Sequence, residues 1–128
     1  MMTQQLDELG EHNYLRFVGV AIATAVADGA VDESERAIIE EICAQVELPE
    51  DKRAVVDEML ASPPDEAQIA RWTHSDDDRI AVYAVGLRVA EADATLRLQE
   101  ARVLDRLRRY LRLTPDEITR AKHQASLA

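Results

Sequence analysis

The two halves of the sequence match each other without a gap when one is shifted by 65 positions. Overlapping apolar periodicities explain part of this match, but not the acidic residues that recur in register. Each half therefore reads as a buried helix, an acidic corner and an amphipathic helix. We predict a pseudo-two-fold bundle with the two buried helices side by side at its centre. The matched pairs are Leu15 and Ile80, Ile22 and Leu87, Asp28 and Asp93, Glu35 and Glu100, Ile39 and Leu104, and Val46 and Leu111.

Apolar residues recur at helical spacing along the chain, and no stretch shows the sustained alternation of a strand. Ala, Leu, Glu and Arg are abundant, which also favours helices. We predict one all-α domain over residues 14–128, with repeat halves at about 14–61 and 76–125. Residues 1–13 form either a frayed leader or a short extra helix with Leu6 and Leu9 on one face. The seven expected helices run from Tyr14 to Ala27, from Asp32 to Val46, from Pro49, after Asp65, from Ser75 to Glu91, from Leu98 to Leu111 and from Pro115.

The first acidic corner contains several carboxylates within one short stretch of chain. Gly29 suits a left-handed residue after the first helix, because it lacks a Cβ. Asp32 can cap the second helix, and Glu35 can complete a capping box three residues later. With Asp28, these acids also match the second half of an EF-hand loop, whereas Thr24 and Val26 stand where its first two acids would be. The corner is therefore either a structural cap or a weak cation site.

Bulk properties exclude several classes of function. The net charge of −10 argues against nucleic-acid and anionic-membrane binding. The acidic N-terminus is unlike a signal peptide, and the Phe17–Ala27 run is too short to span a bilayer, so we expect a cytoplasmic protein with no membrane insertion. Cys43 lies in an apolar pattern and reads as a core residue. The sequence contains no phosphate loop or nucleophile motif, so we do not expect an enzyme.

Basic side chains gather on one expected helix of the second half. Arg102, Arg106, Arg109 and Arg112 fall close together around that helix. They form either a solvated face balanced by the acidic half or a docking surface for an acidic partner or a second copy.

The corner resembles the TerB-like family of bacterial tellurite-resistance and stress proteins, and the related soluble tail of a family of bacterial inner-membrane proteins. The resemblance rests on Ala27-Asp28-Gly29-x-Val31-Asp32-x-x-Glu35-Arg36 and on the second run Glu91-Ala92-Asp93 with Glu100. It implies a TerB-like helical fold and a non-enzymatic role in metal or stress response. By position, it also implies a divalent cation of the Ca²⁺ or Mg²⁺ class at Asp28, Asp32, Glu35, Asp93 and Glu100. Ala94 and Arg97 depart from the family pattern at the second corner.

Two functional hypotheses follow from these features. The first is a TerB-like stress-response module that binds a divalent cation weakly. The alternative is a ligand-free helical module that binds a protein partner or a second copy of itself.

Overall fold

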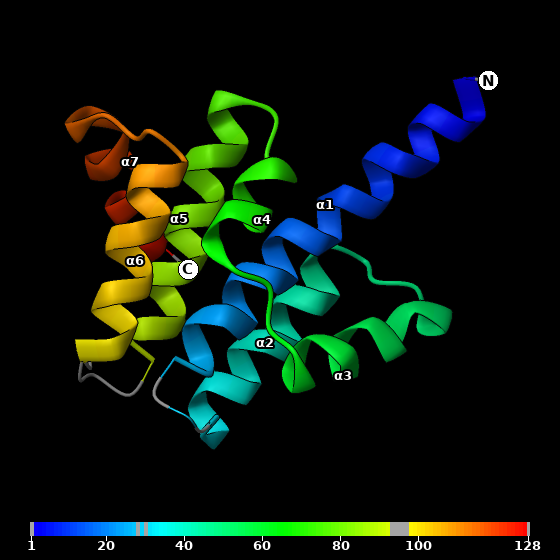
Figure 1. Cartoon of the computed structure of the whole chain (residues 1–128), viewed down its shortest axis with the longest axis horizontal. Coiled ribbons are helices and arrows are strands. Elements are labelled where there is room, and N and C mark those ends of the chain that lie inside the picture. The colour runs from blue at the N-terminus through cyan, green and yellow to red at the C-terminus, as the bar shows by residue number, and fades with distance from the viewer. Residues whose placement is uncertain (1, 28, 30, 93–97, 128) are drawn as a thin grey trace.

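The computed structural model describes residues 2–27, 29, 31–92 and 98–127, and side chains from Tyr14 to Ser126 within those ranges. This part of the chain is a bundle of seven α-helices with one 3₁₀ turn and no strand (Figure 1). The predicted fold class and helix number are therefore confirmed. The elements are α1 (Met2–Ala25), α2 (Glu33–Gln45), η1 (Glu50–Lys52), α3 (Arg53–Ala61), α4 (Glu66–Arg71), α5 (Asp76–Ala90), α6 (Leu98–Tyr110) and α7 (Pro115–Leu127).

The sequence repeat is also a repeat of structure. Helices α2 and α6 begin and end at positions 65 residues apart, and so do the C-terminal ends of α1 and α5. Helix α1 contacts α2, α5 and α6, while α5 contacts α6, α1 and α2. This reciprocal pattern is the one that two halves related by a pseudo-two-fold axis produce. The expectation of two adjacent central helices is confirmed.

Helices α2 and α6 end in the same backbone motif. Glu47 and Arg112, 65 positions apart, both adopt positive φ angles, of 55° and 54°. The next amide donates back across the turn in each case, from Leu48 N to Cys43 O at 3.0 Å and from Leu113 N to Arg108 O at 3.2 Å. This is the hydrogen bond of a Schellman motif, in which glycine is the usual left-handed residue.

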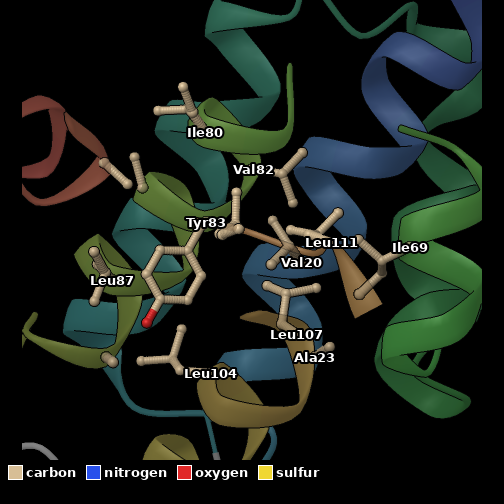
Figure 2. Close-up of a cluster of buried hydrophobic side chains, with 14 residues drawn as sticks. Val20, Ala23, Ile69, Ile80, Val82, Tyr83, Leu87, Leu104, Leu107 and Leu111 are labelled. Atoms are coloured by element: carbon tan, nitrogen blue, oxygen red, sulfur yellow. The ribbon is translucent and has the colours of Figure 1, made fainter. Parts of the chain in front are cut away.

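The core is built around the C-terminal half of α1 and around α5, which are buried on most of their sides. Residues 20–25 of α1 and seven of the last nine residues of α5 are buried. Gly86 permits close packing here, because a Cβ at this position would lie 2.9 Å from Leu104 Cδ2 and 3.5 Å from Val20 Cγ2. Figure 2 shows side chains of α1, α4, α5 and α6 converging in this cluster. A second cluster joins α1 to α2 and α3.

Helix α4 closes the bundle against the side of α1. A Cβ on Gly19 would lie 3.2 Å from Pro64 Cγ and 3.3 Å from Trp72 Cζ3, so the glycine lets this segment approach. The buried Arg16 holds the same region: its guanidinium pairs with Asp78 Oδ2 at 2.9 Å and donates to Trp72 O at 3.3 Å. Trp72 packs against both core clusters.

Two helix starts differ from the sequence prediction by more than one residue. Helix α1 begins at Met2 rather than at Tyr14, because the polar segment before Tyr14 continues the same helix. Pro49 does not open an α-helix: it precedes the 3₁₀ turn, and α3 begins at Arg53. Within the described residues, no helix combines the length and apolar character needed to cross a membrane.

Candidate functional site

The first acidic corner is a complete capping box. Asp32 Oδ1 accepts from Glu35 N at 2.8 Å, and Glu35 Oε1 accepts from Asp32 N at 3.2 Å. Gly29 has a φ of +93°, as predicted for this position, although α1 already ends at Ala25. Asp28 lies outside the described residues. The structure therefore brings Asp32 and Glu35 together in the capping arrangement that the sequence predicted.

Two glutamates at equivalent positions of the repeat are buried. Glu35 in α2 is 3% exposed and Glu100 in α6 is 1% exposed. A buried carboxylate is costly unless it is hydrogen-bonded or paired, and Glu35 meets this requirement by accepting from Asp32 N. Asp93, Ala94 and Arg97 lie outside the described residues, as does the rest of segment 93–97. Across the described residues, no group of three or more His, Cys, Asp or Glu side chains is arranged to hold a metal ion.

The predicted basic face on α6 is partly neutralised by neighbouring acids. Arg106 pairs with Glu66 of α4 at 3.0 Å, and Arg109 pairs with Asp105 at 3.0 Å. A hydrogen bond from Arg108 holds the pKa of Asp105 below its ordinary value. Arg102 and Arg112 are exposed. This pattern agrees better with a solvated, internally balanced face than with a concentrated positive surface.

A groove with a cavity volume of about 390 Å³ lies among α1, α2, α5 and α7. We call it the interhelical groove. Both halves of the repeat contribute to it, since Ile42 comes from α2 and Val85 from α5. Its volume falls within the range of roughly 300–1,000 Å³ that is usual for ligand sites. Its nine lining residues are Phe17, Ile42, Gln45, Val46, Ala81, Ala84, Val85, Arg88 and Gln124.

The interhelical groove is apolar with three polar side chains. Gln45 and Gln124 supply amide groups, and both residues are exposed. Arg88 is mostly buried, with 12% of its side chain exposed, and it pairs with the half-exposed Glu41 at 2.9 Å. This composition suits an occupant with an apolar face and a polar edge.

A family model described as "Protein of unknown function (DUF533)" matches residues 3–125. The chain belongs to this family. Searches of curated proteins and of solved structures gave no significant match. The family model spans both acidic corners, the basic face and the whole interhelical groove, so all of these candidate sites lie within the DUF533 domain.

A cluster of polar contacts around Arg79 holds three helices of the DUF533 domain together. Arg79 donates to Leu111 O at 2.7 Å, and its guanidinium pairs with Asp76 at 2.8 Å and with Glu117 at 2.7 Å. These contacts connect the start of α5 to the end of α6 and the start of α7. A cavity beside Arg79 is also lined by Tyr110, which is 54% exposed.

Sequence reasoning did not find the interhelical groove, the buried Arg16 or the mostly buried Arg88 of the DUF533 domain. The available signal was a charged residue inside an otherwise apolar helical run. Arg16 interrupts the first such run, and Arg88 interrupts the second. Such a residue needs a partner or a solvent-exposed edge, so each marked a place where the core reaches a surface.

Proposed function

We propose that this DUF533 chain is a non-enzymatic helical module that binds protein partners in the interhelical groove. The observation that carries this proposal is the groove itself, with its apolar floor and polar rim at the junction of four helices. Grooves of this kind accept the apolar face of an amphipathic helix, whose anchor residues recur at spacings of three and four.

The lining favours a binding role over a catalytic one. None of its nine residues is a nucleophile or a carboxylate. Arg88 is the one ionised group, and its pairing with Glu41 leaves the rim close to neutral. Apolar contact and shape are thus the main sources of affinity available to an occupant, as at the centre of protein interfaces.

Selection from a library of displayed helical peptides tests this proposal. We expect enriched peptides to carry apolar residues at helical spacing and to lose at least 10-fold in affinity against Ala81→Glu, which places a charge in the groove. Ala44→Glu, on an exposed position of α2 outside the groove, is the matched control and should bind normally. Both variants are checked by circular dichroism. Equal binding to Ala81→Glu, or no enrichment, would contradict the proposal.

A second candidate function is weak binding of a divalent cation at the first corner, in a fold related to the TerB-like family. The observation in its favour is the recurrence of a buried glutamate at both corners, Glu35 and Glu100. The cation site with Asp28, Asp32 and Asp93, and any link to tellurite resistance or stress, stay predictions from the resemblance.

Thermal melts of the chelator-stripped chain with and without millimolar Ca²⁺ or Mg²⁺ test the cation proposal. An ion at about 100 times its Kd stabilises the folded state by about 2.7 kcal/mol. Asp32→Asn keeps a good helix cap but removes the charge, so it should melt normally and lose the ion effect. No shift with either ion, or an equal shift in the variant, would leave Asp32 as a structural cap.

A further inference from the structure

We propose that a second copy of this chain occupies the interhelical groove, through the N-terminal part of α1, so that two chains form a closed dimer. This inference rests on the proposed docking function and names the occupant of its groove. We call residues 2–13 of α1 the N-terminal arm.

The N-terminal arm extends away from the other helices, as Figure 1 shows at the blue end of the chain. It continues α1 for about three turns, or about 18 Å at 1.5 Å per residue. A helix of this length is marginal in water without packing partners. The family match begins at residue 3, so the arm is part of the DUF533 domain rather than an addition to it. In the proposed dimer, the groove of the second copy is the surface against which this extended helix packs.

The N-terminal arm and one residue of the groove lining lie on the same helix, α1. Phe17 lines the groove and follows the end of the arm by a single helical turn. In the proposed dimer the two α1 helices run antiparallel, with the arm of each copy over the groove of the other. This arrangement is isologous and closes on itself, as most homodimers do. Each contact therefore occurs twice across the two-fold axis.

The chemistry of the arm fits that of the groove. Its sequence carries Leu6 and Leu9 at the spacing of helix-in-groove anchors. Residues 1–15 contain three acids, Asp7, Glu8 and Glu11, and no Lys or Arg. The groove rim carries Arg88, which pairs with Glu41, and Arg120, one turn before Gln124 on α7, pairs with the exposed Asp116 at 3.1 Å. Exposed ion pairs contribute little to stability, so an acidic segment can compete for both arginines. Glu41 is half exposed, so its side chain can turn to solvent when an acidic segment approaches Arg88.

The test is the mass of the full chain in solution, measured by light scattering after size exclusion and by sedimentation over a range of concentrations. We expect wild type to have twice the 14.3 kDa mass of one chain. The double variant Leu6→Ser/Leu9→Ser and the groove variant Ala81→Glu should each weaken the dimer at least 10-fold. Leu98→Ser, on α6 and 62% exposed, is the matched control and should stay dimeric.

Three results would overturn the dimer. They are a monomer at every concentration up to about 1 mM, a dimer that neither variant weakens, and a dimer weakened by the arm variant but not by Ala81→Glu. The last result would place the arm on another surface. If the chain is monomeric while selected peptides still bind the groove, the docking function stands and the self-association is rejected. If the peptides also fail, both are rejected.

Discussion

Two residues of this chain adopt a backbone conformation that their side chains disfavour. Glu47 and Arg112 stand at the left-handed position after α2 and α6, where an L-residue costs roughly 1–2 kcal/mol relative to glycine. Glu47→Gly removes this strain but adds about 0.4–1 kcal/mol of unfolded-state entropy. We therefore expect a net stabilisation of about 0.5 kcal/mol in urea unfolding, and a similar gain for Arg112→Gly.

The matched control for Glu47→Gly is Ala44→Gly, an exposed position inside the last turns of α2. Glycine in a helix interior costs about 1 kcal/mol relative to alanine, so this variant should be destabilised. If Glu47→Gly is destabilised as much as Ala44→Gly, the left-handed conformation of Glu47 carries no strain, and the prediction is wrong.

Cys43 links the stability of the chain to pH. Burial raises the pKa of its thiol above the ordinary value. In the unfolded chain the thiol ionises at about pH 8.5, so the neutral thiol's contribution to folding is complete below that pH. It is lost as the pH rises through the higher folded pKa, because the unfolded chain then releases its proton more readily. We expect the urea midpoint of wild type to fall more steeply above pH 8.5 than that of Cys43→Ala. Parallel pH profiles would refute this.

Local signals at single residues were readable from the sequence. The capping pair Asp32 and Glu35 and the left-handed Gly29 depend on neighbours within three or four positions, and all three were predicted. Glu47 and Arg112 were not, because the sequence offers no glycine or asparagine to mark the turn. Their conformation follows from the packing of Leu48 and Leu113 into the core beyond the helix end.

At the scale of elements, Gly86 decides how closely α5 approaches α6. Gly86→Ala improves helix propensity by about 1 kcal/mol. Its new Cβ would, however, meet Leu104 Cδ2 at 2.9 Å inside a packed core, and overpacking usually costs about 1–3 kcal/mol. We expect a net loss of about 1 kcal/mol in chemical unfolding.

The shortened side chain of Leu104→Ala provides the internal control for Gly86→Ala. That variant alone should lose about 2–5 kcal/mol, but it frees the space that the new Cβ needs. In this background Gly86→Ala should become neutral or stabilising. A destabilisation of the same size in both backgrounds would show that the contact with Leu104 is not the cause.

Most helix starts were predictable to within one residue, and the two that were not have physical causes. Apolar periodicity reports burial, so it placed the start of the first helix at Tyr14, which is buried. The polar segment before it has no proline to stop the helix, which continues to Met2. Pro49 fits the first turn of either helix type, so its presence did not distinguish a 3₁₀ turn from an α-helix.

At the scale of the whole molecule, the two halves should unfold as one unit. Phe17, Trp72 and Val85 pack against both core clusters, so neither cluster is complete without the other half. Ile42→Ala and Leu107→Ala remove buried side chains at equivalent positions of the repeat and should each cost about 2–5 kcal/mol.

Hydrogen exchange monitors both halves separately in these variants. Each substitution should lower protection in α2 and α6 alike, within a single cooperative transition. Loss of protection confined to the substituted half, or two resolved transitions in a melt, would show that the halves are independent units.

The candidate site was less predictable than the fold, because it depends on contacts between residues that are far apart in the sequence. The repeat gave the arrangement of helices because it is a pattern along the chain. The interhelical groove combines side chains of four helices, and several of them, such as Val46, carry an apolar signal identical to that of core residues. Tertiary packing alone distinguishes a side chain that lines a groove from one that fills the core.

The position of Trp72 has a practical consequence. It is the one tryptophan in the chain, and it lies where α4 meets α1, with Gly19 beneath its ring and Arg16 bonded to its carbonyl. Its fluorescence emission therefore reports the solvation of the contact between α4 and α1. The chain carries its own spectroscopic label, and loosening of α4 would be visible as a red shift without any dye or added probe.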